Sequence, residues 1–264
     1  MNHLLRHLAP ITERTWATLD HEARTRLAPA LGARALVDFA GPLGWEHSGT
    51  SLGRVGPTFD ADGVRGRSRR VLPLVEARAA FSLSRDELDA DARGAADTDL
   101  GPLDDAAARL ARRENTAVLD GWEAAGITGV TAASPHAPLA LPGDLGALAT
   151  VVASAVETLA GAGVGGPYGI ALDSPTWIAV SGGSDDGGAP LRHHLERVLG
   201  GPVVWAPGLR GAVVVSRRGG DFLFESGQDI SLGYAAHTAD AVELYLEESF
   251  SFRVATPEAA IALR

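Results

Sequence analysis

Residues 221–264, DFLFESGQDISLGYAAHTADAVELYLEESFSFRVATPEAAIALR, decide the fold of this chain. The block holds two short apolar runs, DFLFES and DISLGY, and then a longer run, AVELYLEESFSFRV, that starts at residue 241. Apolar and polar residues alternate along these runs, and a period of two is typical of β-strands. Only Glu247 and Glu248 interrupt the alternation. The C-terminal block is therefore predicted to be β structure.

Upstream of this block, the sequence predicts a strand, a short helix and one long helix. LVEARAAFSL, residues 74–83, alternates as a strand, and SRDELDADARG follows it as a capped helix. Apolar residues at helical spacing then run from Leu103 to a glycine stop at Gly126. We expect the helix over 103–126 to be the central spine of the fold.

The N-terminus carries apolar residues at helical spacing. Leu4, Leu8 and Ile11 form a stripe that Pro10 interrupts, and a second helix is predicted to start from a cap at Thr12. We therefore expect two helices that meet at a bend.

The segment 41–70 has little regular pattern and is rich in glycine, serine and arginine. Such a long irregular stretch is uncommon in a compact domain, unless it is a functional arm. We interpret it as a β-hairpin that reaches out to another chain. Arg65, Arg67, Arg69 and Arg70 are expected to project from one face of it, either toward acids of a neighbour or simply into solvent.

From about residue 127 the composition changes, and the chain becomes low in charge and rich in alanine, glycine and valine. The pattern to about residue 218 predicts helices that alternate with short strands. The expected helices cover 145–160 and 190–199, and the expected strands cover 168–172, 203–205 and 212–216. This segment is predicted to form a second subdomain.

Composition excludes several classes of function. The 264 residues carry a net charge of −10, which argues against nucleic acid or anionic lipid as a partner. All basic residues are arginine and no cysteine is present, so lysine-based and thiolate chemistry are excluded. No apolar run approaches the ~20 residues of a membrane span, and the N-terminus does not match a secretory signal. We expect a cytoplasmic protein.

Two glycine motifs resemble catalytic or nucleotide-binding signatures but lie in the wrong context. Gly161, Gly163 and Gly166 spell G-x-G-x-x-G, yet the motif ends a predicted helix, whereas pyrophosphate binding needs the start of one. Gly182, Ser184 and Gly187 miss the spacing of a nucleophile elbow by one residue. We interpret both as turns.

Polar side chains elsewhere give no convincing active site or metal site. His193 and His194 are adjacent on a predicted helix, so their side chains diverge and are interpreted as surface residues. Asp185 and Asp186 lie in a glycine-rich loop. In a monomer this loop would be a solvated turn, whereas in a ring of copies the two aspartates would form an acidic annulus that attracts cations. The candidate sites in the sequence therefore favour a structural or binding protein whose extended arm contacts a partner.

An ordered series of motifs spanning the whole chain resembles the encapsulins, the family once called linocin-like bacteriocins. The part from Arg218 to Leu263 is the most specific, because a long ungapped pattern of mixed residue types rarely matches by chance. The motifs that carry the resemblance are LAPIT, Arg34 with Val37-Asp38, GPLGW, PLVEARAAFSLSRDELD, Gly166-Pro167-Tyr168 and RRGGDFLFESGQDISLGY.

The resemblance implies an α+β fold of the HK97 phage-capsid type and a non-enzymatic shell protein. A peripheral domain, an extended E-loop and an axial domain are expected. The expected division is 1–45 for the N-terminal helix and start of the peripheral domain, 46–72 for the E-loop, 73–126 for the rest of that domain with the spine helix, 127–218 for the axial domain and 219–264 for the β block that completes the peripheral domain.

The resemblance also implies sites for a cargo enzyme and for small molecules. A pocket on the inner wall is expected to hold the C-terminal targeting peptide of the cargo, with polar contacts from Arg34 and Asp38. Asp229, Ile230 and Leu232 would line its strand side, and we add the apolar stripe of Leu4, Leu8 and Ile11. The loop with Ser184, Asp185, Asp186 and Gly187 would line a five-fold pore.

No cofactor is expected. Some family members bind flavin through a tryptophan on the helix after the FSLS-like strand, but Asp86 occupies that position here. The expected partners are further copies of the chain, in a sixty-subunit icosahedral shell, and one cargo protein. A dye-decolorizing peroxidase or an iron-storing ferritin-like protein is the expected cargo. A viral major capsid protein and, less favoured, a hydrolase or bacteriocin remain as alternatives.

Overall fold

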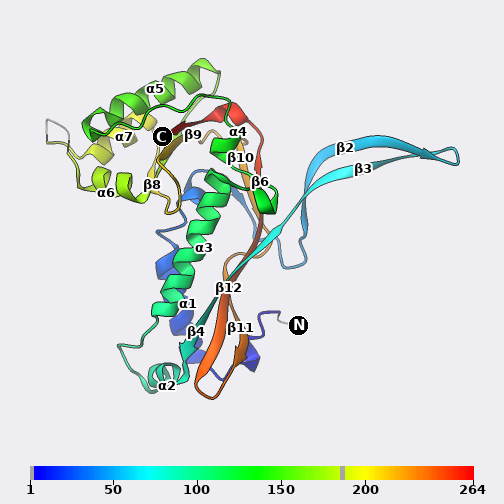
Figure 1. Cartoon of the computed structure of the whole chain (residues 1–264), viewed down its shortest axis with the longest axis vertical. Helices are drawn as coiled ribbons and strands as arrows, with labels where there is room; N and C mark the ends of the chain where they lie inside the picture. The colour runs from blue at the N-terminus through cyan, green and yellow to red at the C-terminus, as the bar shows by residue number, and fades with distance from the viewer. Residues whose placement is uncertain (1–2, 185–187) are drawn as a thin grey trace.

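The computed structural model of the chain describes residues 3–184 and 188–264. It is extended, with the long helix α3 beside a twisted sheet, a second α/β unit at one end of that helix, and a hairpin that projects sideways (Figure 1). The helices are α1 Glu13–Leu27, α2 Arg85–Arg93, α3 Gly101–Leu119, α4 Val130–Ala133, α5 Leu148–Gly161, α6 Ser174–Gly182 and α7 Leu191–Leu199, with 3-10 turns η1 Arg6–Leu8, η2 Gly32–Ala35, η3 Glu123–Ala125, η4 Leu145–Ala147 and η5 Pro257–Ala259.

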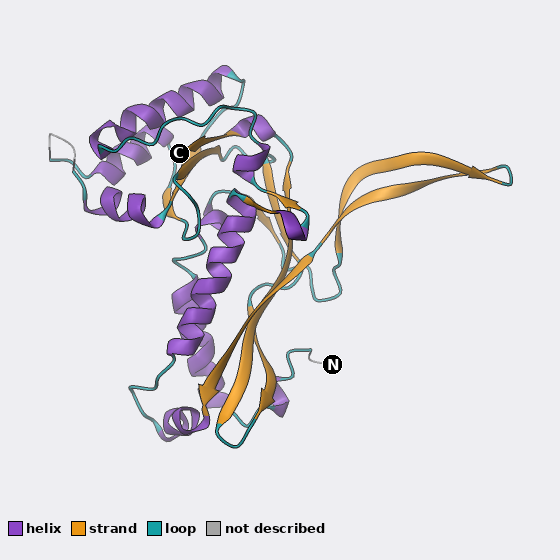
Figure 2. Cartoon of the chain, in the orientation of Figure 1, coloured by secondary structure: helices purple, strands orange, loops and turns teal. Residues whose placement is uncertain are grey.

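The strands form two larger sheets and two hairpin pairs (Figure 2). Their bounds are β1 Asp38–Ala40, β2 Gly49–Ala61, β3 Val64–Pro73, β4 Val75–Ser84, β5 Gly121–Trp122, β6 Ile127–Thr128, β7 Tyr168–Leu172, β8 Val203–Trp205, β9 Ala212–Ser216, β10 Phe222–Ser226, β11 Ser231–His237, β12 Ala241–Val254 and β13 Ala260–Leu263.

The C-terminal β block forms the first sheet, which confirms its assignment as strands. β12 pairs antiparallel with β11, β10 and β4, and β1 adds parallel to β10. The sheet is buried on both faces along β12, so this strand shows a nearly continuous run of buried residues. The last strand departs from expectation, because β13 pairs with β9 in the second sheet and does not complete the first.

The spine helix is shorter than predicted. α3 begins at Gly101 but ends at Leu119, whereas the pattern predicted continuation to Gly126. At Gly121 the backbone adopts φ +108°, a conformation that a helix does not allow, and the chain turns into the short β5–β6 pair. Trp122 on β5 and Ala125 in the 3-10 turn η3 therefore pack against the core from outside the helix.

The first predicted helix is reduced to one 3-10 turn, η1. Leu5 has φ +52° and Ala9 is extended, and Pro10 prevents a helix from continuing through it. The second predicted helix is confirmed, because α1 starts after Thr12, whose Oγ1 accepts a hydrogen bond from the Thr15 amide at 3.2 Å. The N-terminal residues therefore form an irregular segment ahead of one firm helix.

The second sheet has the order β13-β9-β7-β8 and is flanked by α5, α6 and α7. Its predicted strands 168–172, 203–205 and 212–216 are confirmed, and the helix predicted over 190–199 is α7. Gly161 ends α5 and Tyr168 starts β7, so the G-x-G-x-x-G motif is a helix-to-strand turn, as interpreted.

The arm predicted from 41–70 is confirmed as the β2–β3 hairpin, which extends away from the body (Figure 1). It reverses at Asp62 and Gly63, both with positive φ, as tight hairpin turns require. The prediction that four arginines share one face is wrong. Arg65, Arg67 and Arg69 alternate onto one face of β3, and Arg70 is one residue out of phase with them.

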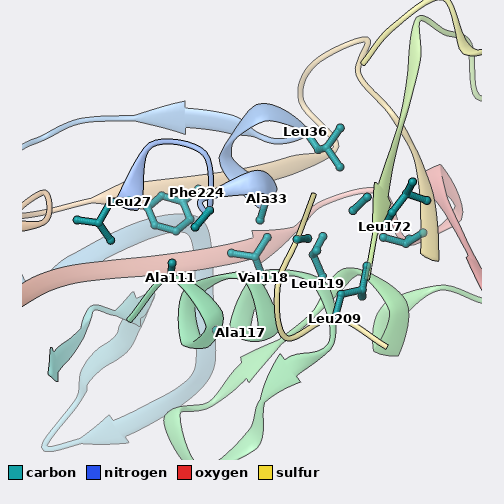
Figure 3. Packing of buried hydrophobic residues seen from close by; sticks show 14 of the residues in the cluster. Leu27, Ala33, Leu36, Ala111, Ala117, Val118, Leu119, Leu172, Leu209 and Phe224 are labelled. Carbon is teal, nitrogen blue, oxygen red and sulfur yellow. The ribbon is translucent and has the colours of Figure 1, made fainter. Parts of the chain in front are cut away.

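The hydrophobic core runs from α1 and α3, across the first sheet, to the second sheet. Figure 3 shows where it is continuous between these parts, with Val118, Leu119 and Leu209 packed close to one another. Gly32 lies at this joint, because a Cβ on it would come 2.0 Å from the carbonyl oxygen of Trp205. Close packing here fixes the segment that carries Arg34 into the site described next.

Candidate functional site

A cavity of about 430 Å³ lies between α1, the N-terminal segment and β11. Its lining combines apolar side chains, which we call its floor, with charged groups of both signs, which we call its rim. The lining residues are Leu4, Arg6, Asp20, Ala23, Arg24, Leu27, Ala28, Leu31, Arg34, Asp229, Ile230, Ser231, Leu232 and Leu246. A concave site that combines apolar side chains with placed polar groups is a common form of a ligand site.

Helical periodicity and a strand edge build this cavity. Residues three or four apart along a helix share a face, so α1 presents Asp20, Ala23, Arg24 and Leu27 to the cavity in two successive turns. On the opposite wall, β11 is the last strand of its sheet, and its Tyr234 amide donates to the Leu4 carbonyl at 2.9 Å. The N-terminal segment is thereby held beside the strand edge.

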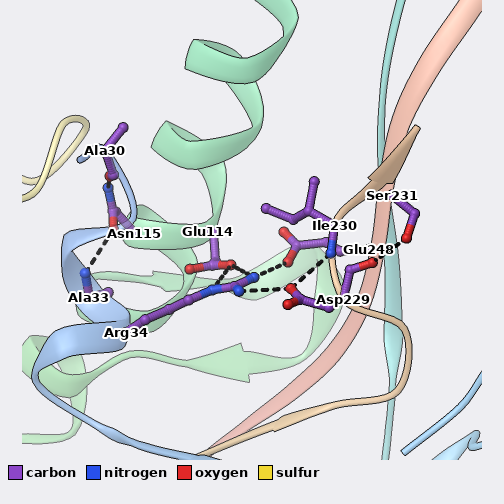
Figure 4. Close-up of polar contacts among 9 residues, drawn as sticks. All are labelled: Ala30, Ala33, Arg34, Glu114, Asn115, Asp229, Ile230, Ser231 and Glu248. Carbon is purple, nitrogen blue, oxygen red and sulfur yellow. Dashed lines mark hydrogen bonds and ion pairs between the residues drawn. The ribbon is translucent and has the colours of Figure 1, made fainter. Parts of the chain in front are cut away.

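Arg34 lies at the inner end of the cavity, in a buried network of ion pairs (Figure 4). Its guanidinium donates to Glu114 at 2.8 and 2.5 Å, to Asp229 at 2.7 Å and to Glu248 at 3.1 Å. Burial alone would lower the pKa of Arg34, but the hydrogen bonds and charge of Glu114 outweigh it and raise this pKa. Arg34 is therefore a permanent cation, and it orients Asp229 at the rim.

Glu248 shares this guanidinium with Glu114. Both carboxyl groups are fully buried, and in each the second oxygen, Oε1, has no hydrogen-bond partner within the described residues. Burial, and after it the neighbouring Glu114 carboxylate, raises the pKa of Glu248 well above its ordinary value. The raised pKa favours the protonated form of Glu248 beside the Glu114–Arg34 ion pair.

The two acids that interrupted the sequence pattern have one explanation. Adjacent strand residues point to opposite faces, and β12 is covered on both faces. Glu248 reaches Arg34 on one side, while Glu247 accepts a 2.7 Å hydrogen bond from Arg78 on the other. Glu247 and Glu248 therefore contact different arginines on opposite faces of the sheet.

A backbone clamp fixes the position of Arg34. The Asn115 side chain, which is buried on α3, accepts from the Ala33 amide at 3.0 Å and donates to the Ala30 carbonyl at 2.7 Å (Figure 4). It also donates to the Pro207 carbonyl at 3.2 Å, across the joint to the second sheet. The loop that carries Arg34 is thus tied to the spine helix on both sides of Gly32.

Among the eight residues predicted for cargo docking, the structure brings five together. Leu4, Arg34, Asp229, Ile230 and Leu232 line the cavity.

The other three lie outside it. The Asp38 carboxylate accepts a 2.5 Å hydrogen bond from the Gly220 amide in a separate small hollow. The Leu8 side chain is 55% exposed, and Ile11 packs against the core. The expected helical stripe is not formed because the segment is a single 3-10 turn.

Sequence reasoning missed the α1 wall and both acids behind Arg34. The α1 residues recur at helical spacing, so the pattern could have identified the face but not what it meets. Glu114 lies three residues after Ala111 and four before Val118, on the buried face of α3. A charged residue on such a face is a signal of a buried partner.

The predicted pore residues lie largely outside the described residues. Ser184 forms an isolated bridge with Pro190, and Asp185, Asp186 and Gly187 are not among the residues that the structure describes. Within residues 3–184 and 188–264, no group of three or more His, Asp or Glu side chains is arranged to hold a metal ion. In the same ranges, no helix is long and apolar enough to cross a bilayer.

The fold of the chain is shared with capsid and virus-like-particle proteins of known structure. It superposes on a virus-like particle from Pyrococcus furiosus with a TM-score of 0.65 at 15% identity, over 94% of this chain and 99% of that one. It also resembles the capsid of Mycobacterium phage Bobi, with a TM-score of 0.55 at 15% identity, covering 89% and 85%. At these identities the likeness concerns the fold alone, which is the HK97-like capsid fold, as predicted.

Sequence comparison identifies the family. A family described as "Encapsulating protein for peroxidase" matches residues 1–251. Type 1 encapsulin shell proteins from Rhodospirillum rubrum and Brevibacterium linens are 44% and 41% identical to this chain, covering all of it and 97% and 99% of their own lengths. The chain belongs to the encapsulin shell proteins. Because these relatives are named as shell proteins, the prediction of a structural, non-enzymatic role is confirmed.

Proposed function

We propose that this chain assembles into a closed shell of sixty copies, which encloses a cargo enzyme in the cytoplasm. Relatives with this fold form multi-subunit shells, so self-assembly follows from the family. The hairpin supports this role, because it exposes large apolar residues that a lone chain leaves in water; Val64, for example, is 71% exposed. The cargo class that we propose is a dye-decolorizing peroxidase, with a ferritin-like protein second, and the family description supports the first.

The cavity between α1 and β11 is the proposed dock for the C-terminal peptide of the cargo. The observation that carries this proposal is the part of the β11 edge that lines the cavity at Ser231 and Leu232, beside an apolar floor; farther along the same edge, Tyr234 is already bound by Leu4. An extended peptide can add to a strand edge through its backbone and place alternate side chains into the floor. Ile230, Leu232 and Leu246 would receive apolar side chains of the peptide.

The rim would select for charge. Arg6 is paired with Asp20 at 2.8 Å and Asp229 is held by Arg34, so each of these groups is oriented before a peptide arrives. Arg24 adds a further cation to the rim. We therefore propose that the peptide is mainly apolar and carries a charged residue at a flank, with Arg34 acting as the positioning residue for Asp229.

Small ions would enter through the loop 181–188. In the proposed shell, copies of this loop surround each five-fold axis. The charges of Asp185 and Asp186, two residues that lie outside the described ranges, would then attract cations.

Native mass of the purified chain tests assembly. Sixty copies of a 27.3 kDa chain give about 1.6 MDa. A peak at that mass by mass photometry supports the shell, and a much heavier peak supports a shell of larger triangulation number. Species near the mass of one or two chains would contradict the proposal.

A matched pair of isoleucine variants tests docking. Ile230→Glu places a charge in the cavity, whereas Ile178→Glu places the same charge at a side chain 70% exposed on α6. Each shell is co-expressed with a fluorescent protein that carries the C-terminal peptide of a dye-decolorizing peroxidase, the proposed cargo. We expect Ile230→Glu to form empty shells and Ile178→Glu to form filled ones. Equal filling of both would overturn the docking site while leaving the shell intact.

A further inference from the structure

A second cavity, of about 320 Å³, lies between α1 and the α2–α3 connection, at the end of α3 that is farther from the second sheet (Figure 1). It shares no lining residue with the proposed cargo dock, because it meets a different face of α1. Two of its lining residues, Ala96 and Asp99, are exposed, so the cavity opens to solvent in the single chain.

A buried acid without a partner lines this cavity. Asp91, near the end of α2, is only 5% exposed. Its Oδ2 has no hydrogen-bond partner within residues 3–184 and 188–264. A desolvated carboxylate that stays unpaired is costly, so Asp91 needs a donor that the described residues do not supply.

Two further buried acceptors in the lining lack partners within the same ranges. They are Oδ1 of Asp104, at the start of α3, and the Thr98 hydroxyl, on the α2–α3 connection. Among the described lining residues Arg26 is the one cation, and its guanidinium is already bound to Glu22 at 2.6 Å and to Asp104 at 2.8 Å. Burial raises the pKa of Asp104, although Arg26 opposes the shift. The cavity therefore has more acceptors than donors.

The charge of the cavity is negative. Four carboxylates line it and Arg26 supplies one positive charge, which leaves a net formal charge of −3. The surrounding segment has the same character, because residues 85–105 carry eight aspartates and glutamates against two arginines. Such a field attracts a small cation from solution, and most strongly a multivalent one.

We propose that this cavity binds a linear polyamine, a small organic polycation whose ammonium groups donate to Asp91, Thr98 and Asp104. An ammonium has three N–H donors that do not lie in one plane, which suits acceptors from three separate elements. The methylene groups between the amines would lie against Ala95 and Leu100, which also line the cavity. The volume of the cavity is at the lower end of the range of small-molecule sites, about 300–1,000 Å³.

Other sources of positive charge fit the cavity less well. The part of the chain that the structure describes contains no group of three or more acids or histidines placed to hold one metal ion. A second copy cannot bring an ammonium side chain, because the sequence contains no lysine. The polyamine would therefore come from solution, and this inference is independent of the cargo dock.

Calorimetric titration with spermidine, a trivalent polyamine, tests the site. The titration of the purified protein is run in physiological salt, because exposed charges are screened there over about 8 Å and a buried charge is screened much less. Asp91→Asn is compared with Asp89→Asn, which makes the same change of charge at an exposed residue of α2 outside the cavity. We expect the wild type and Asp89→Asn to bind equally, and Asp91→Asn to bind at least about tenfold more weakly.

Three results would overturn the proposal. The first is the absence of spermidine binding to the wild type. The second is equal binding by all three proteins, which would mean that spermidine recognises only the general negative charge of the surface. The third is binding of Mg²⁺ or Ca²⁺ that depends on Asp91 and excludes spermidine, which would assign the cavity to a metal ion.

Thermal unfolding provides a second, independent test. Asp91→Asn is nearly isosteric and removes an unpaired charge, so without spermidine the variant should be at least as stable as the wild type. Added spermidine should raise the melting temperature of the wild type and of Asp89→Asn, but not that of Asp91→Asn. A lower melting temperature of Asp91→Asn without spermidine would show that the carboxylate already has a partner in the assembled protein, and would contradict the proposal.

Discussion

The buried network around Arg34 gives the sharpest prediction about stability. Glu248 is 1% exposed and its single contact with Arg34 is 3.1 Å long, whereas Glu114 receives two hydrogen bonds from the same guanidinium. If Glu248 carries a proton, Glu248→Gln preserves both shape and charge. Arg34→Met, in contrast, removes the one cation that these three acids contact within the part of the chain that the structure describes.

The two substitutions should therefore differ widely in effect. Removing one member of a buried ion pair costs about 3–5 kcal/mol, whereas an isosteric replacement of a neutral partner should cost less than about 1 kcal/mol. For a chain of this size each kcal/mol shifts the melting temperature by about 2–4 °C. We expect Arg34→Met to lower it by about 6–20 °C and Glu248→Gln by less than about 4 °C.

The assay is thermal unfolding of purified shells, followed by circular dichroism at several pH values. A carboxyl whose pKa is raised in the folded state loses stabilisation as pH rises from its unfolded pKa, near 4.5, toward its folded pKa. The wild type should therefore lose stability over that window, and Glu248→Gln should lose less. Equal destabilisation by Glu248→Gln and Arg34→Met at neutral pH would show that Glu248 is ionised and refute the reasoning.

Three further predictions follow from other parts of the molecule. Gly32→Ala should destabilise the joint between the sheets by about 1–3 kcal/mol or more, because its Cβ would overlap the Trp205 carbonyl. The control is Gly143→Ala, whose Cβ would meet no atom within 4 Å, and both variants are compared by thermal unfolding. Burial tends to raise the pKa of Glu225, but hydrogen bonds from Thr50 and His47 outweigh burial and lower this pKa. A shell with Glu225→Gln should therefore lose less stability than the wild-type shell as pH falls below about 4.5. Equal acid sensitivity of the two shells would count against this prediction. Replacing Asp185 and Asp186 by asparagine should slow cation entry, and unchanged filling rates of an iron-storing cargo would remove the pore proposal.

Several elements could be predicted from the sequence because their signals are local. The alternation in β12, the Thr12 cap of α1 and the turn at Asp62 and Gly63 depend on residues within a few positions of one another. Predictions failed where backbone conformation overrode an apolar pattern. Leu5 and Gly121 both adopt positive φ, so the expected first helix became one turn and the spine helix ended early.

The sequence by itself determined the family, the order of helices and strands, and the existence of an arm that needs partners. Only the tertiary structure decided which charges meet. Arg34 binds Glu114 and Glu248 across 80 and 214 residues of chain, and no local spacing encodes such pairs. The same holds for the cavity beside β11, whose walls come from α1 and the C-terminal sheet. Packing of distant elements creates these sites, because a side chain acquires a partner only after the sheet has fixed the face to which it points.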